Sequence, residues 1–405
     1  MDKTIILLTN TYPFSEKGET FIHSEVEVLS KLAHKIYIIP REGDINPDHE
    51  IQLPSNVTIY PLQSIGKIHK FAYFMSSPGL VFHLIKEILK EFNNRKYALR
   101  YATKAIRGTY TMKHIMKKEK LNPSQVILYS YWFHFNALAV ALYKGKVYKK
   151  IARAHGYDFY KDRAIQVFKE FTAKKVDHIY AASETAMNYI QTEYNADNVY
   201  TSLLGVNNDF HLPKFQRGKS LRLVSCSRLI ELKRVNLIID VLASIDDIHI
   251  TWTHMGGGDS EKAIQEYARQ KLDHKSNIQY KLNGHLTNSD VYELYKNDIF
   301  DLFITLSSTE GGAPVSVQEA QSFAIPVIAT NVGGISALVN EKTGKRIDSI
   351  DEKEIIRQGV KAIRDYNQLS TEQIVKVREN CRAHWRENFD AQIVYRKFFQ
   401  RIQED

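Results

Sequence analysis

The chain has 405 residues, of which 43% are hydrophobic and 25% are charged, and its formal net charge is +9 at pH 7. Its length favours two domains of about 200 residues each, and its composition is typical of a soluble globular protein. No apolar run reaches the roughly 18 residues of a membrane-spanning helix, and the first apolar run is too short for a signal peptide. Two cysteines, Cys226 and Cys381, are too few for a disulfide framework. We therefore expect a cytoplasmic protein with reduced thiols.

The first half of the chain alternates strand-like and helical segments. Residues 4–10 predict a strand, 20–33 a helix and 35–40 a second strand, which together form the strand–helix–strand unit of a parallel sheet. Three further segments continue the strands: 125–130, 149–155 and 178–183.

Residues 67–120 carry most of the positive charge. This window holds 13 Lys and Arg but only three acids, Glu87, Glu91 and Glu119, so its net charge is +10 and that of the rest is −1. Because basic helices with apolar faces are attracted to anionic lipid head groups, one hypothesis is contact with an anionic membrane surface. The alternative is an ordinary solvated helical face. No nucleic-acid-binding motif accompanies the charge, so we expect no nucleic-acid partner.

The apolar periodicity lapses over residues 201–220, and we place the domain boundary there. The predicted domains are 1–205 and 206–385, with 386–405 as a C-terminal helix that packs back toward the first domain. A second alternating series predicts a doubly wound domain of the Rossmann type. Its strand-like segments are 221–227, 248–255, 278–284, 301–307 and 326–330.

Ligands of such sheets bind outside the carboxyl ends of the strands, so the polar residues there are candidates for a site. Arg228 and Lys233 follow the first strand of the second domain and precede a helix. Two cations beside a helix N-terminus suit a diphosphate. The alternative is a pair of solvated surface cations.

Glycines follow the next strand, at Gly256, Gly257 and Gly258. They permit a tight turn and close approach of a ligand. The run is not G-x-G-x-x-G and does not open the chain, which disfavours a nicotinamide-dependent dehydrogenase.

The segment STEGGAPVSVQEA, from residue 308 to 320, carries two glutamates. Glu310 and the residues after it predict a turn, Pro314 suits the first helical position, and Glu319 follows in the second helical turn. Carboxylates accept hydrogen bonds from sugar hydroxyls, so one glutamate could serve a donor sugar and the other a ribose. Alternatively, Glu310 interacts only with the helix dipole and Glu319 is a surface acid.

At these motifs the chain resembles the retaining glycosyltransferases of family 4, which have the GT-B fold of two Rossmann-like domains facing each other across a cleft. The similarity rests on TEGGAPVSVQEAQSFAIPVIATNVGG, LVSCSRLIELKRVNLII, RAHGYDFY, TSLLGVNNDF and the N-terminal NTYPFSEKGETFIHSEVEVLSKL, and it spans nearly the whole chain in the family's order. Glu310 and Glu319 enclose eight residues where the family has seven. TSLLGVNNDF lacks the family's Pro-Asn before its Gly-Val.

The resemblance implies that domain 1–205 binds the acceptor and domain 206–385 the nucleotide sugar, and it implies roles for the residues of these motifs. Arg228 and Lys233 would hold the donor diphosphate, and Glu319 would hold the ribose hydroxyls. Glu310 and His155 are the expected catalytic residues, both at hydroxyls of sugars. The other expected donor contacts are Gly18, Gly284, His285, Gly311, Gly312, Ala313, Pro314 and Val315.

By the same resemblance, the chain would transfer a hexose or N-acetylhexosamine, with retention, from a nucleotide sugar with UDP as the default. The acceptor would be lipid-linked or a polysaccharide of the bacterial cell surface, and the protein would lie in the cytoplasm, peripherally at the membrane. No D-x-D triplet occurs, so neither a metal nor a cofactor is expected. Two alternatives stay open: a GT-B hydrolase or epimerase of nucleotide sugars, and an inactive nucleotide-sugar-binding or membrane-docking protein.

Overall fold

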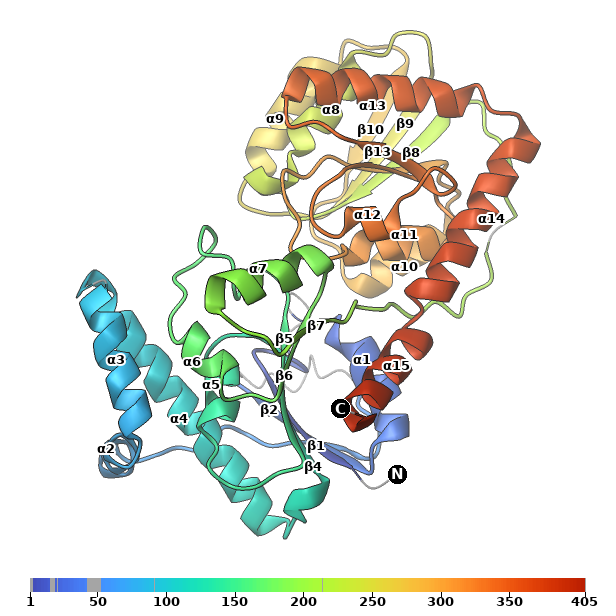
Figure 1. Ribbon diagram of the computed structural model, residues 1–405. Helices are drawn as coiled ribbons and strands as arrows, with labels where there is room; N and C mark the ends of the chain where they lie inside the picture. The colour runs from blue at the N-terminus through green and yellow to red at the C-terminus, as the bar shows by residue number, and fades with distance from the viewer. Residues whose placement is uncertain are drawn as a thin grey trace. The chain divides into compact units, whose positions relative to one another are not determined.

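The computed structural model describes residues 3–14, 19, 21–41, 52–90, 92–212 and 214–404. The chain divides into two compact units, Met1–Leu203 with Tyr395–Asp405, and Leu204–Val394. The sequence predicted this division between residues 205 and 206, and it predicted that the chain packs back on the first domain from residue 386. Each unit is a parallel sheet covered by helices (Figure 1), so the predicted pair of Rossmann-like domains is confirmed.

The first unit has a seven-stranded parallel sheet in the order β3-β2-β1-β4-β5-β6-β7. Its strands are β1 (Thr4–Thr9), β2 (Lys35–Pro40), β3 (Val57–Ile59), β4 (Val126–Ser130), β5 (Lys149–Ala154), β6 (His178–Ala181) and β7 (Val199–Thr201). Every residue of β1 and β4 is buried. Such continuous burial is expected of parallel strands with helices on both faces, and it explains why these strands are continuous apolar runs in the sequence.

Helices cover both faces of this sheet. Figure 1 shows α1 and α15 on one face and α4 and α5 on the other. The ring of Phe398 in α15 lies 4.9 Å from that of Tyr180 and 5.8 Å from that of Tyr129. The helices of this unit are α1 (Ile22–Leu32), α2 (Lys67–Met75), α3 (Pro78–Lys90), α4 (Arg95–Lys118), α5 (Phe135–Leu142), α6 (Lys169–Ala173), α7 (Glu184–Tyr194) and α15 (Ala391–Glu404).

The second unit has a six-stranded parallel sheet in the order β10-β9-β8-β11-β12-β13. Its strands are β8 (Leu221–Cys226), β9 (Ile250–Met255), β10 (Ile278–Leu282), β11 (Leu302–Thr305), β12 (Val327–Thr330) and β13 (Gly344–Ile347). Its helices are α8 (Val235–Ala243), α9 (Glu261–Leu272), α10 (Asn288–Asn297), α11 (Val315–Ser322), α12 (Ile335–Leu338), α13 (Glu352–Asn367) and α14 (Thr371–Asn388). The strand order reverses between β8 and β11, which makes their carboxyl ends the switch point of a doubly wound sheet.

The C-terminal segment differs from the helix that the sequence predicts over residues 386–405. It forms two helices, α14 and α15, which break at Phe389 and Asp390. The backbone of Asp390 bridges to Val206, and its carboxylate accepts a hydrogen bond of 2.8 Å from the amide of Gln392. The break follows from this pairing with a distant segment. In the described parts of the chain, no helix combines the length and the apolar character required to cross a bilayer.

Candidate functional site

The candidate site of the second unit lies at the switch point of its sheet. The loop after β8 carries Arg228 and Lys233, and the loop after β11 carries Glu310. β8 and β11 are paired neighbours although a stretch of 75 residues separates them (227–301). The sheet therefore brings the two loops together at the edge where ligands bind in this class of fold.

A cavity of about 220 Å³ opens between the loop after β8 and the start of α11, the helix that follows the loop after β11. It is lined by Cys226, Ser227, Arg228, Lys233, Met255, Gly256, Leu286, Val291 and Ser316. Ser316 belongs to the first turn of α11, where the backbone amides have no partner within the helix. The cavity therefore combines two cations with the electropositive end of a helix, an environment that suits a phosphate group.

Lys233 and Glu310 form an ion pair at this cavity. The Lys233 Nζ lies 2.5 Å from the Glu310 Oε1, and the two side chains are 23% and 11% exposed. The neighbouring Arg234 holds the two loops together, because its guanidinium donates hydrogen bonds to the carbonyls of Leu306 and Ser307 at 2.7 and 3.0 Å. The pair thus joins residues for which the sequence predicted separate roles, the diphosphate and the transferred sugar.

Two glycines support the turn that carries Glu310. Gly333 has a φ of +55°, and a Cβ added there would lie 2.2 Å from the carbonyl oxygen of Glu310. The amide of Gly334 donates a hydrogen bond of 3.0 Å to the carbonyl of Gly312. Only glycine fits such a close approach of two backbones. This supporting role was not predicted from the sequence, although the Gly-Gly pair in the loop after β12 is a signal for it.

Pro314 is the N-cap of α11, and the helix begins at Val315. The prediction that Pro314 takes the first helical position is therefore off by one residue, because the ψ of Pro314 is 129° and its backbone is extended. Gly311 and Ala313 lie in the preceding turn, and Ala313 is buried.

Glu319 lies inside the unit rather than on its surface, at 6% exposure. The Asn288 side-chain amide donates a hydrogen bond of 2.8 Å to its Oε1. Burial raises the pKa of Glu319 to about 7, although the Asn288 hydrogen bond opposes the shift. A buried carboxyl with one partner has acceptor capacity left for hydroxyl groups.

Gly284 and His285 lie beside the same cavity. The amide of Gly256, which lines the cavity, donates a hydrogen bond of 2.8 Å to the carbonyl of Gly284. Gly256 has a φ of +133°, and a Cβ there would lie 2.0 Å from the carbonyl oxygen of Ser227. The glycine run therefore serves the close approach of the loops after β8 and β9.

His155 belongs to the first unit, directly after β5. Its ring lies 4.9 Å from that of Tyr131 and 4.8 Å from that of Trp132, and neither ring nitrogen has a hydrogen-bond partner among the described residues. Burial, only partly offset by the charge of Asp158, lowers its pKa to about 4. The nearest acid is Asp158, whose Oδ2 lies 4.0 Å from the His155 Nδ1. A neutral, mostly buried imidazole that makes no hydrogen bond within the described residues is suited to one with a ligand.

Gly18 lies outside the described residues. The next residue, Glu19, was missed by the sequence analysis. Its buried carboxylate accepts hydrogen bonds from the amides of Asn10, Thr11 and Tyr12 at 2.7 to 3.1 Å. The Trp132 indole also donates to it. Glu19 therefore fixes the loop after β1, and its signal was an acid at the start of a helix.

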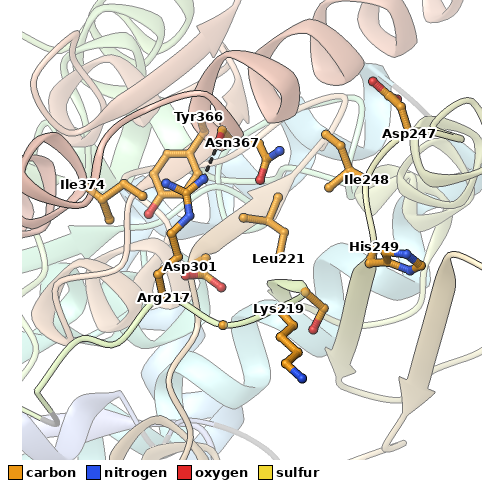
Figure 2. A pocket seen from close by; sticks show the side chains of 12 residues that line it. Arg217, Lys219, Leu221, Asp247, Ile248, His249, Asp301, Tyr366, Asn367 and Ile374 are labelled. Atoms are coloured by element: carbon orange, nitrogen blue, oxygen red, sulfur yellow. Dashed lines mark hydrogen bonds between the residues drawn. The ribbon is translucent and has the colours of Figure 1, made fainter.

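A further cavity of the second unit lies at the opposite edge of its sheet, where β8 and β9 begin (Figure 2). Two of its charged groups serve the fold: Arg217 donates hydrogen bonds to the carbonyls of Leu369 and Asn367, and Asp301 pairs with Arg222 at 2.8 Å. The amino ends of parallel strands are not the usual ligand edge. We therefore place the candidate site at the carboxyl ends.

Solved structures share the fold over almost the whole chain. One is the lipopolysaccharide outer core galactosyltransferase WaaB, with 15% identity, 98% of each chain covered and a TM-score of 0.69. S. aureus TarM, solved with fondaparinux, α-GlcNAc-glycerol and UDP, shares 13% identity over 99% of each chain with a TM-score of 0.69. Anabaena HepE, solved with UDP and glucose, shares 14% identity over 100% of each chain with a TM-score of 0.65.

Among curated proteins, no sequence matches this chain significantly. The family described as glycosyl transferases group 1 matches residues 208–382, a segment that contains every residue lining the cavity between the loop after β8 and the start of α11. The chain therefore has the fold of the GT-B glycosyltransferases, and its second unit matches the group 1 family of these enzymes.

Proposed function

We propose that this protein is a retaining glycosyltransferase that moves a hexose or N-acetylhexosamine from a nucleotide sugar, with UDP as the nucleotide, to an acceptor. The acceptor is lipid-linked or a polysaccharide, and the reaction belongs to bacterial cell-surface glycan synthesis. The observation that carries the proposal is the Lys233–Glu310 ion pair, at the rim of a cavity that Arg228 and the start of α11 also line.

Each group at the cavity has a task in this reaction. Arg228, Lys233 and the first amides of α11 would bind the diphosphate, and Glu319 would accept hydrogen bonds from the ribose. Glu310 would receive a hydroxyl of the transferred sugar once the diphosphate engages Lys233. The base would lie near Gly284 and His285. TarM was solved with UDP, and HepE with UDP and glucose, which supports the choice of nucleotide.

In this proposal the protein accelerates transfer by stabilising charge in the transition state. The bond from the anomeric carbon to the diphosphate breaks, and a bond to the acceptor oxygen forms on the same face. The proton of the acceptor hydroxyl passes to the leaving phosphate oxygen, so charge and atoms balance without a metal. Negative charge grows on the leaving group, and preorganised cations stabilise it most in the transition state.

Nucleotide binding tests the donor site first. A thermal-shift panel should compare UDP, GDP and UDP-sugars, with and without chelator, on the wild type, Arg228→Ala and the control Arg386→Ala on the exposed face of α14. A ligand at a hundredfold excess over its Kd stabilises the folded state by about 2.7 kcal/mol. We expect a chelator-insensitive shift with UDP that Arg228→Ala loses and Arg386→Ala keeps.

Transfer of radiolabelled sugar to membrane or polysaccharide fractions then separates the enzyme classes. Donor turnover that requires an acceptor supports the transferase. Turnover without an acceptor supports a hydrolase or epimerase, and nucleotide binding without any turnover supports an inactive binding protein. Absence of any nucleotide shift would overturn the donor site itself.

We further propose that the protein is cytoplasmic and docks on the inner face of the membrane through α2 and α3. Each helix has one apolar stripe that packs inward, with Leu80 buried. Each also has a second stripe at spacing i, i+3, i+7 that faces outward. The outward residues, 51–83% exposed, are Ile68, Phe71, Met75, Phe82, Ile85 and Leu89. Apolar stripes beside basic residues suit an anionic lipid surface.

Vesicle co-sedimentation tests this docking surface. The variant Phe71→Asp with Leu89→Asp should lose most binding to vesicles that contain anionic lipid. The control Ile350→Asp changes an apolar side chain of the second unit that is 92% exposed, and it should bind as the wild type does. Equal binding of both variants would contradict docking through α2 and α3.

A further inference from the structure

The first unit contains a second cavity at a switch point, which none of the roles above uses. Its strand order also reverses, between β1 and β4. A cavity of about 520 Å³ lies where β1, β2, β4 and β5 end, and its lining includes Asn10, Arg41, Trp132 and Tyr157. This volume lies in the usual range for small-molecule sites, and its position is the ligand edge of such a sheet.

The charged groups of this cavity are mainly positive. Among the described residues, Arg41, Arg100 and Lys104 line it together with one acid, Asp158. The carboxylate of Asp158 already accepts hydrogen bonds from the backbone amides of Phe133, His155 and Gly156 at 2.7 to 2.9 Å. An anion that enters the cavity therefore meets three cations and a carboxylate whose acceptor positions are largely occupied.

Two of the three cations lie over the same aromatic ring of the cavity. The guanidinium of Arg41 lies 4.6 Å and the ammonium of Lys104 lies 5.4 Å from the centre of the Phe135 ring. Phe135 is the first residue of α5, whose N-terminus favours negative charge. Burial and neighbouring cations, Arg41 and Lys104 among them, hold the pKa of His134 well below its usual range. Positive potential is thus concentrated at the start of α5.

Aromatic rings form much of the remaining wall. Trp132 is half-buried, whereas Tyr97 is 40% and Tyr157 is 67% exposed. Rings with an apolar face and a polar edge suit the face of a pyranose, which also combines C–H groups with hydroxyls. The cavity therefore offers ring surface and positive charge side by side.

We propose that this cavity binds the acceptor, and that the acceptor is a sugar carrying a phosphate. This inference rests on the proposed glycosyltransferase function and narrows its acceptor class. The phosphate meets Arg41, Arg100 and Lys104, and the sugar ring lies against Trp132 and the two exposed tyrosines. One wall, Trp132, also contacts the ring of His155 at 4.8 Å. The cavity therefore adjoins the residue expected to act at a sugar hydroxyl.

Tryptophan fluorescence gives a direct readout of this cavity. The chain has three tryptophans, and Trp252 and Trp385 are fully buried in the second unit at 0% and 1% exposure. Trp132 is therefore the tryptophan that a ligand of the first unit reaches. Titration with glucose 1-phosphate, galactose 1-phosphate and N-acetylglucosamine 1-phosphate should change the emission, and Trp132→Phe should abolish the change. The neutral sugars should bind at least about tenfold more weakly.

A matched pair of charge variants tests the phosphate contact. Arg100→Gln removes a cation of the cavity, and Lys96→Gln removes an exposed cation of the same helix outside it. We expect Arg100→Gln to weaken sugar phosphate binding about tenfold and Lys96→Gln to leave it unchanged. Equal effects of the two variants, or equal affinity for neutral and phosphorylated sugars, would overturn the proposal.

Two further probes distinguish the source of the phosphate and test the proposed function independently of the acceptor. The same sugar on a short-chain prenyl diphosphate is the second probe: tighter binding than the sugar 1-phosphate assigns a lipid-linked acceptor, and equal or weaker binding assigns a phosphate of the glycan. Calorimetry with UDP reports the donor site of the second unit where Arg228→Ala abolishes the binding. UDP binding without sugar phosphate binding refutes the acceptor inference only, whereas loss of UDP binding refutes the donor site.

Discussion

The buried carboxyl of Glu319 should make nucleotide-sugar binding depend on pH near neutrality. Burial raises its pKa to about 7, against an ordinary value of 4.5. In the proposed complex the ribose hydroxyls donate hydrogen bonds to this group, so the ionised form binds the ligand better. The perturbation is therefore a change of pH from 6 to 8, which removes the competing proton.

The size of the effect follows from the fraction ionised. With a pKa of about 7, about one tenth of the carboxyls is ionised at pH 6 and about nine tenths at pH 8. The Kd should therefore fall about tenfold over this range, which corresponds to about 1.4 kcal/mol. The folding stability of the free protein changes with pH in the opposite direction. Because the pKa of Glu319 is raised in the folded state, the group stabilises the fold at low pH, and this contribution is lost as the pH rises from 4.5 toward 7.

Calorimetry with a UDP-sugar is the assay, because its diphosphate is esterified at both ends and gains no proton between pH 6 and 8. Glu319→Gln is the control, since an amide keeps the shape without the titration. The wild type should bind more tightly as the pH rises, and the variant should show a flat profile. If both proteins give the same pH profile, Glu319 does not meet the ribose or is already ionised at pH 6.

Three further substitutions test the structure. Lys233→Met should lower kcat about 100- to 1,000-fold in a transfer assay, as loss of one charge-stabilising donor does, whereas a purely structural ion pair with Glu310 would change only the melting temperature. Gly333→Ala should destabilise the second unit by about 1–3 kcal/mol in urea unfolding, because its φ of +55° suits glycine; an unchanged midpoint would refute the close approach. Arg153→Met should lower the unfolding free energy of the first unit by about 3–5 kcal/mol. The Arg153 Nε lies 3.2 Å from the buried Glu25 carboxylate, which the variant leaves without its cation. A smaller loss in calorimetric unfolding would mean that Glu25 takes up a proton instead.

The fold class was predictable because its strands are buried on both faces. The segments that became β1, β4 and β12 are short continuous apolar runs, and helical patterns lie between them. This alternation predicts parallel sheets in two domains. The break between α14 and α15 was not predictable, since it depends on the pairing of Asp390 with Val206, which is distant in sequence.

The contact between Lys233 and Glu310 depends on strand order, which the sequence does not contain. The two residues are 77 positions apart and meet only because β11 crosses back to lie beside β8. The motifs indicated each residue by itself, as a cation and as a carboxylate. Their pairing comes from the sheet and from Arg234, which was not singled out.

The basic window of residues 67–120 divides into parts with different surroundings. The sequence predicted one surface for all of its charges, in contact either with anionic lipid or with solvent. The structure places the outward apolar stripes on α2 and α3, whereas Arg100 and Lys104 of α4 line the cavity of the first unit. Net charge along a chain does not reveal this division, because it does not show which helix and which face of that helix each charge occupies.

Lys233 cannot compensate the charges of Glu310 and of a diphosphate fully at the same time. This competition determines how the proposed enzyme binds its donor. In the free protein the ion pair compensates a carboxylate that is only 11% exposed, which limits the cost of burying it. A diphosphate brings two negative charges, which Lys233 and Arg228 match, and Glu310 then needs a new partner. The hydroxyls of the transferred sugar supply it, so a complete nucleotide sugar satisfies every charged group, whereas a nucleotide alone leaves Glu310 without compensation. In the proposed enzyme, the sugar is therefore recognised through the balance of charge that it restores.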